Sequence, residues 1–195
     1  RYLHFTVGRV LGQAGVEGLT RSSGSPQTDV ICHGPVIIWL MDVRGYTRLA
    51  EHQSPEENFA LLSPLFKIVH EELEEAGGLL LEFAGDCVIV AFNTPGRPKV
   101  SIEKVLAQTA RLLRRLHTLN ALARPAGAPL VRVGIGLDRG KVALGFLGGL
   151  RRCHPGILGR AVNRAARIEG QTKILDRAVL LSARCFEGGT PQVWK

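Results

Sequence analysis

No apolar run in this sequence is long enough to cross a bilayer. The longest continuous runs, 36–41 and 87–92, fall far short of the roughly 18 residues that a membrane helix requires. Cysteine is scarce, with four among 195 residues and no C-x-x-C spacing, and there is no internal repeat or low-complexity block. With 45% apolar residues, these absences exclude a disulfide-rich miniprotein, a collagen-like fibre and a disordered chain, and they predict one globular domain with at most a short appendage.

The cysteines and the start of the chain bear on location. Two of the four cysteines lie inside apolar runs, where a reduced thiol packs as a small hydrophobic group, so we expect a reducing cytosol. The chain opens at Arg1 without a charged-then-apolar leader, which predicts a part of a longer protein rather than a secreted product. The expected location is therefore cytoplasmic, with any membrane tether outside this sequence.

Basic residues outnumber acidic ones by 25 to 17, which gives a formal net charge of +8. Such an excess attracts nucleic acid, an anionic membrane surface or small phosphorylated ligands. Arg111, Arg114 and Arg115 lie in a predicted helix without interleaved aromatic residues or a recognisable nucleic-acid module. We interpret them as a solvent-facing group and expect no nucleic-acid partner.

The order of predicted elements indicates an α/β sandwich. Residues 1–33 form a lead segment, with a weak helical stripe that could transmit a signal and a turn-rich linker over 21–29, and the globular domain spans 34–195. Its first predicted elements are a strand ending at Asp42, a helix from Pro55 to the Gly77-Gly78 pair, and a hairpin of 79–84 and 87–92. A helix over 102–122 and a second hairpin, of 131–137 and 141–146 with its turn at 138–140, follow. The last predicted elements are a glycine-rich stretch, a helix over 160–169 and a strand over 178–182. This order predicts an antiparallel sheet backed by helices, as in split βαβ, ferredoxin-like folds.

Two aspartates stand at the ends of neighbouring predicted strands. Asp42 ends the first strand, and Asp86 lies at the tip of the first hairpin. Two carboxylates so placed can hold two divalent cations about 4 Å apart for phosphoryl transfer. On spacing alone, a capping aspartate and a turn aspartate explain the same pattern.

Two further segments suit a phosphorylated ligand. Gly45, Tyr46 and Thr47 lie where a strand passes into a helix, and free backbone N–H groups at such a junction can cradle a polyphosphate. Asn163 and Arg167 are four residues apart and share one helix face, which combines a planar amide with a fixed cation. A solvated basic face is the alternative explanation of the second segment.

Together these segments resemble the catalytic domain of class III nucleotide cyclases, over roughly residues 34–182. Asp42-Val-Arg-Gly-Tyr-Thr is similar to the family's Asp-Ile-x-Gly-Phe-Thr, and Phe83-Ala-Gly-Asp86 resembles its Gly-Asp hairpin. Arg132-Val-Gly-Ile-Gly and Gly140-Lys-Val-Ala-Leu-Gly resemble its central hairpin. The most specific match is Gly159-Arg-Ala-Val-Asn163-Arg-Ala-Ala-Arg167, which resembles the family's Gly-x-x-Val-Asn-x-Ala-x-Arg signature.

The resemblance implies a two-metal nucleotide cyclase. Asp42 and Asp86 would hold two Mg²⁺ or Mn²⁺ ions, with the carbonyl of Val43 as a further ligand. Asn163 would orient the ribose, and Arg167 would stabilise charge on the phosphorus. In the family these two halves come from different subunits, so a head-to-tail homodimer acting on a nucleoside triphosphate is implied.

The positions that match the family's purine-reading residues are Glu82 and Gly156. Adenylate-forming members usually have Lys where this chain has Glu82, and a carboxylate accepts hydrogen bonds from guanine N1–H and its 2-amino group. Gly156 has no side chain with which to read the base. The resemblance therefore favours a guanylate cyclase that forms cyclic GMP, with an adenylate cyclase of relaxed selectivity and a non-catalytic nucleotide-sensing dimerisation module as alternatives.

Overall fold

A single β-sheet forms the middle layer of the part of the chain that the computed structural model describes, namely residues 30–123, 125, 129–149 and 152–186. The strand order is β2-β3-β1-β4-β5, and β6 pairs with a different stretch of β4. The strands are β1 (Val30–Val43), β2 (Leu79–Ala84), β3 (Cys87–Phe92), β4 (Val133–Gly149), β5 (Arg152–Leu158) and β6 (Val179–Leu181). The pairing is antiparallel except for β4 with β6, which is parallel.

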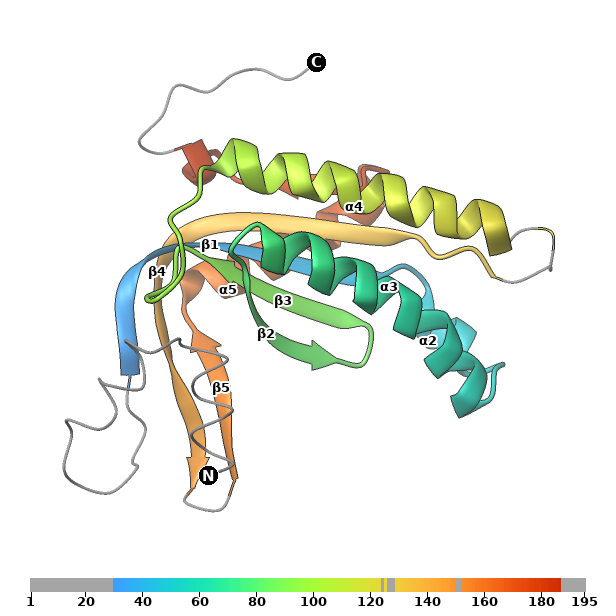
Figure 1. Cartoon of the computed structure of the whole chain (residues 1–195), viewed down its shortest axis with the longest axis horizontal. Coiled ribbons are helices and arrows are strands. Elements are labelled where there is room, and N and C mark those ends of the chain that lie inside the picture. The colour runs from blue at the N-terminus through green and yellow to red at the C-terminus, as the bar shows by residue number, and fades with distance from the viewer. Residues whose placement is uncertain (1–29, 124, 126–128, 150–151, 187–195) are drawn as a thin grey trace.

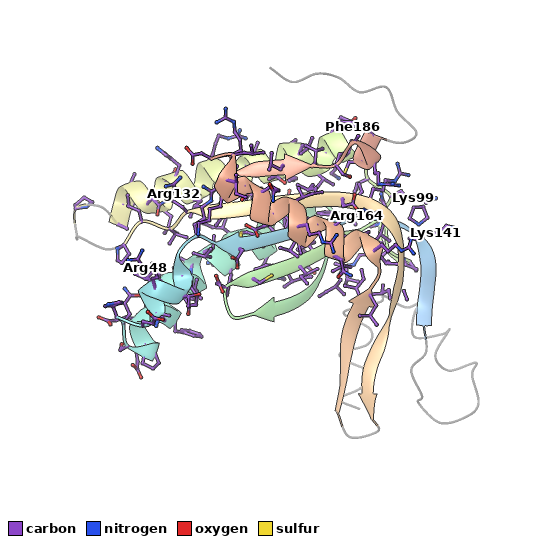
Figure 2. The ribbon with its side chains drawn as sticks, turned by 180° about the vertical axis from the view of Figure 1, so that it is seen from behind. Arg48, Lys99, Arg132, Lys141, Arg164 and Phe186 are labelled. Atoms are coloured by element: carbon purple, nitrogen blue, oxygen red, sulfur yellow. The ribbon has the colours of Figure 1, made fainter. Side chains whose placement is uncertain are left out.

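The sheet is backed by helices, as predicted, and they cover both of its faces. On one face lie α3 (Pro55–Glu75) and α4 (Ile102–Ala123), and on the other lies α5 (Arg160–Ile174) (Figures 1 and 2). Alternation along β1 explains both layers, because successive side chains of a strand point to opposite faces. Trp39 and Met41 belong to the apolar cluster beneath α3 and α4, whereas Ile38 and Leu40 belong to the cluster beneath α5.

Ion pairs join α3 to α4. Glu72 of α3 is only 2% exposed, and its carboxylate lies 3.1 Å from Arg111 Nε and 2.9 Å from Arg115 Nη1 of α4. Arg115 also pairs with Glu71 at 2.6 Å. The side chains of Arg111 and Arg115 are 52% and 41% exposed, in line with the predicted solvent-facing group, but both also pair with a buried carboxylate, which requires a cationic partner.

The second predicted hairpin is wrong. β4 runs without interruption through Asp138, Arg139 and Gly140, where a turn was expected. Asp138 is fully buried and is held by Arg164 of α5 and by Ser182, so a local turn signal is overridden by distant partners. The hairpin lies further along the chain, where β4 pairs with β5 in a two-stranded arm (Figure 1). The glycine-rich stretch before α5 thus contains a strand.

Several boundaries shift. β1 begins at Val30, four residues before the expected start of the domain, and α5 continues to Ile174 rather than 169. The predicted helix in the lead segment lies outside the described residues. Burial raises the pKa of the free Cys185 thiol to about 11, so this cysteine packs as a small apolar group. Among the described residues, no helix combines the length and the apolar character that a membrane span needs.

Candidate functional site

Two glycines of β4 let α5 pack so closely on the sheet that no side chain fits between the helix and the strand. A Cβ at Gly136 would overlap the carbonyl oxygen of Ala165 and the amide nitrogen of Glu169. A Cβ at Gly134 would overlap side-chain oxygens of Glu169 and Thr172. The glycines therefore form a seat for α5, and this seat sets where the helix presents its polar side chains.

Asp42 and Asp86 meet at one end of the sheet, as the sequence predicts. Asp42 ends β1, Asp86 lies in the tight turn between β2 and β3, and the two half-buried carboxyl groups share a hydrogen bond. Burial, this hydrogen bond and the charge of Asp86 raise the pKa of Asp42 from 3.8 to about 7, against the opposing effect of the Val43 backbone. The pair is therefore unfavourable when both groups are ionised, which a bound cation would relieve.

A third carboxylate, Glu169, faces this pair from α5. Asp42 is opposite Gly134 in the β1–β4 register, and the Glu169 carboxylate lies directly over Gly134. Burial and the charge of Asp86 raise the pKa of Glu169, while the Thr172 hydroxyl and Arg44 act against them. Sequence analysis missed Glu169. Its spacing of four and eight residues from the small residues Ala165 and Ala161 was the available signal that it faces the sheet.

Arg44, also missed, connects the end of β1 to the end of α5. Its Nη2 donates to the carbonyl of Thr172 at 3.0 Å and to that of Arg177, and its Nη1 lies 3.5 Å from Asp176. A cation that donates to the last carbonyls of a helix is favourable, because those carbonyls have no partner within the helix. Arg44 therefore holds the chain immediately after Asp42 and Val43 against α5.

The predicted phosphate-binding turn follows Arg44. Gly45 has a φ of 72° and precedes the short helix α2 (Tyr46–Ala50). A Cβ at Gly45 would meet nothing within 4 Å, so the left-handed backbone, rather than crowding, requires glycine. Tyr46 packs against the core beneath α3, and Thr47 is exposed. The backbone of Val43 ends β1 beside Asp42.

Asn163 and Arg167 lie on the other side of α5 from the carboxylates. Both are exposed, whereas Ala161 and Ala165 are fully buried against the sheet. Arg167 and Glu169 are two residues apart, which in an α-helix separates them by about 200° around the axis. Within one chain, the structure therefore keeps the Asn163–Arg167 pair away from the Asp42–Asp86 pair.

The two predicted base-reading positions lie in strands near one apolar cluster. Glu82 is opposite Ile89 in β2, just after an irregularity in the register, and Gly156 is opposite Gly145 in β5. Their sequence neighbours Leu81 and Ile157 pack in the same cluster beneath α5. The positions therefore belong to the same region of the fold.

Two of the surface hollows formed by the described residues lie away from these positions. One of about 350 Å³ lies between α4 and the residues around Arg44, and one of about 400 Å³ lies between α3 and the end of α4. No predicted site residue lines either hollow. Within the described residues, no group of three or more His, Cys, Asp or Glu side chains is arranged to hold a metal ion by itself.

The family model of the adenylate and guanylate cyclase catalytic domain matches residues 30–185. The chain is 29% identical over 164 residues to an adenylate cyclase of Anabaena cylindrica, covering 84% of this chain and 31% of that protein. It is 30% identical over 147 residues to adenylate cyclase 1 of Rhizobium meliloti (strain 1021), covering 75% and 22%. This chain thus spans less than a third of the length of these curated relatives.

Solved structures of cyclases also resemble this chain. The guanylyl cyclase Cya2 superposes with a TM-score of 0.73 at 26% identity, covering 84% of this chain and 82% of that one. A bacterial light-regulated adenylyl cyclase superposes with a TM-score of 0.74 at 25% identity, covering 98% and 55%. The chain belongs to the class III family of adenylate and guanylate cyclase catalytic domains, as the resemblance in its motifs predicts, and it has that family's mixed α/β sheet backed by helices.

Proposed function

We propose that this domain converts a nucleoside triphosphate to its 3′,5′-cyclic monophosphate and pyrophosphate, with GTP as the favoured substrate, in a homodimer with two equivalent sites. The observation that carries the proposal is the meeting of Asp42 and Asp86 at one end of the sheet. Family membership supplies the reaction class.

The donor set suits divalent cations, which the family generally uses. Mg²⁺ and Mn²⁺ prefer oxygen ligands and are commonly held by one or two carboxylates together with substrate phosphates. Asp42 and Asp86 would hold two such ions, with the Val43 carbonyl as a further ligand. When bound, the ions would lower the pKa of the ribose 3′-hydroxyl and neutralise charge on the phosphates.

The other predicted residues would bind and orient the nucleotide. The turn at Gly45, Tyr46 and Thr47 follows the carboxylate pair directly and would present backbone N–H groups to the triphosphate. Asn163 would position the ribose, and Arg167 would stabilise negative charge that develops on the reacting phosphoryl group.

The position of these two residues on α5 supports a homodimer. Asn163 and Arg167 face outward and away from the carboxylates of their own chain. One chain therefore supplies a carboxylate half-site and an Asn/Arg half-site that do not meet. Two chains arranged head to tail would bring each carboxylate half-site against the Asn/Arg half-site of the other chain, so a monomer should be inactive.

Glu82 is the reason for favouring GTP. Its carboxylate would accept hydrogen bonds from guanine N1–H and the 2-amino group, whereas adenine N1 is itself an acceptor. Cyclisation of ATP is the second candidate, because the two curated relatives above are named adenylate cyclases and Gly156 contributes no side chain to the choice.

The test is product formation by the purified dimer with GTP or ATP, in Mn²⁺ and in Mg²⁺. We expect cyclic GMP to predominate with the native chain, and Glu82→Lys to shift the product ratio toward cyclic AMP. Mainly cyclic AMP from the native chain would overturn the base assignment alone. No product from either nucleotide, with a dimer confirmed by light scattering, would favour the nucleotide-sensing module.

The shared site has a separate test. Asp42→Ala and Arg167→Ala should each be inactive alone. Mixed under conditions of subunit exchange, they should recover about a quarter of the native rate, since half of the dimers are mixed and each mixed dimer holds one complete site. A mixture as inactive as its components would contradict the head-to-tail arrangement.

A further inference from the structure

Asp138 is a charged side chain with no exposed surface, placed in the middle of β4 on the face covered by α5. Both of its oxygens have partners. Arg164 Nε and Nη2 each lie 2.7 Å from Oδ2, and the Ser182 hydroxyl donates to Oδ1. Burial of a carboxylate is costly unless it is paired and hydrogen-bonded in this way, so this group of three must keep its geometry.

Arg164 makes a further contact with the sheet besides the one to the Asp138 carboxylate. Its Nη2 also donates to the carbonyl of Arg139 at 3.4 Å. A Cβ at Gly140 would lie only 2.9 Å from the same Nη2, so the absence of a side chain at Gly140 leaves the guanidinium its place. Figure 2 shows Arg164 on α5 where the helix crosses the sheet.

This anchor is adjacent in sequence to Asn163 and three residues before Arg167. The glycines of β4 fix how closely α5 approaches the sheet, but Ala161 and Ala165, the buried residues in this half of the helix, are too small to fix its rotation about its own axis. The Arg164 guanidinium, bound to the centre of β4, therefore sets how the outer face of this half of α5 is aimed.

We propose that Asp138, Arg164 and Ser182 are positioning residues that aim Asn163 and Arg167 into the active site shared with the second chain. This inference rests on the proposed function. None of the three acts on the nucleotide. They act through α5, and their effect belongs to the Asn/Arg half-site and not to the carboxylate half-site of the same chain.

Asp138→Asn is the sharpest variant, because it keeps the size of the side chain and an acceptor for Ser182 while it removes the charge that holds Arg164. We expect kcat to fall by about 10- to 100-fold, since a displacement of about 1 Å in a positioning group costs rates of that order. The KM for the nucleotide should change less than threefold, because the carboxylate pair and the phosphate-binding turn are untouched.

Subunit mixing then tells a positioning role from a merely structural one. With Asp42→Ala, an Asp138→Asn chain should recover about a quarter of the native rate, because the mixed dimer contains one site with native Asn163 and Arg167. When the Asp138→Asn chain is mixed with Arg167→Ala, the rate should not exceed that of Asp138→Asn alone. Every site in that mixture has an altered Asn/Arg half-site. Equal recovery in both mixtures, or in neither, would overturn the proposal.

Glu72→Gln is the matched control, since Glu72 is another buried carboxylate bound by arginine, but it lies between α3 and α4. It should recover activity in both mixtures. Arg164→Lys, which keeps the charge but cannot hold Asp138 through two nitrogens, should behave as Asp138→Asn does and carries the test if the latter does not fold. An inactive mixture of Asp42→Ala with Arg167→Ala would instead overturn the shared site, and this inference with it.

Discussion

The two faces of the sheet are held to their helices in different ways. Beneath α3 and α4 the contact is made by large side chains such as Trp39, Phe92 and Leu112, all fully buried. Beneath α5 an apolar cluster that includes Ile38 and Leu40 is joined by the glycines of β4, which bring backbone against backbone. Side-chain packing can adjust to a small shift by changing rotamers, whereas a backbone seat cannot. The face that carries the predicted chemistry therefore tolerates less change in the distance between helix and sheet.

The buried carboxylates repeat this contrast. Glu72 joins two helices through arginines whose side chains are 52% and 41% exposed. Asp138 joins a helix to the centre of the sheet through Arg164, which is 33% exposed, and beside the residues assigned to the reaction. We expect the ion pairs of Glu72 to affect the stability of the fold, and the ion pair of Asp138 to affect the rate of cyclisation. Four substitutions would sharpen or break the comparison.

The largest effect is expected from Gly136→Ala. The new methyl group would overlap backbone atoms of Ala165 and Glu169, so α5 would have to leave its seat. Stability should fall by about 3 kcal/mol, at the upper end of what overpacking costs, and cyclase activity should be abolished. Urea unfolding and the product assay measure the two losses. Native activity in this variant would show that α5 is not held by the glycine seat.

Glu72→Ala should come next and should act on stability alone. It removes the ion pairs of Arg111 and Arg115 with Glu72, but these arginines are half exposed and are solvated by water, so we expect a loss of about 2 kcal/mol, as for hydrogen bonds to a charged group. The fraction that remains folded should retain native kcat. A reduced kcat in fully folded protein would remove the distinction between the two faces.

A smaller effect is expected from Asp42→Asn in chelator. The pKa of Asp42 is raised to about 7 in the folded protein, so the folded state holds a proton that the unfolded state releases near pH 4. This contribution to stability is complete below about pH 4 and is lost as the pH rises through 7. The variant should therefore melt about 2–4 °C above the native chain at pH 8, which corresponds to roughly 1 kcal/mol.

Metal should reverse the order of the two melting temperatures, so that the native chain melts above Asp42→Asn. Mn²⁺ at pH 8 should raise the melting temperature of the native chain and leave that of Asp42→Asn almost unchanged. This thermal shift reports on the metal site without depending on turnover. An equal shift in both proteins would place the metal elsewhere.

The smallest effect is expected from Gly170→Ala. Gly170 lies in the same helix as the seat contacts, but a Cβ there meets nothing within 4 Å. Replacing glycine by alanine within a helix should stabilise the protein by about 0.5–1 kcal/mol with unchanged kcat. It is the matched counterpart of Gly136→Ala. A loss of stability would show that α5 does not have the packing described above.

The sequence allowed prediction of what depends on local pattern. Periodicity and turn residues located α3, α4 and the β2–β3 hairpin, and the spacing of motifs brought Asp42 and Asp86 together. The failures concern long-range partners. Asp138-Arg139-Gly140 has the composition of a turn, and distant partners, Arg164 at 26 residues and Ser182 at 44 residues from Asp138, hold it in a buried strand instead. Glu169 was missed for the same reason, because its acidic neighbours are distant in sequence.

The opposed faces of α5 have a consequence for regulation. In the proposed homodimer, the inner face of one α5 approaches the carboxylates of its own chain through Glu169, while its outer face supplies Asn163 and Arg167 to the other site. Each such helix is therefore common to both reactions. Nucleotide binding that tilts it at one site alters the geometry of the second, so the enzyme would show cooperative kinetics without any separate effector site.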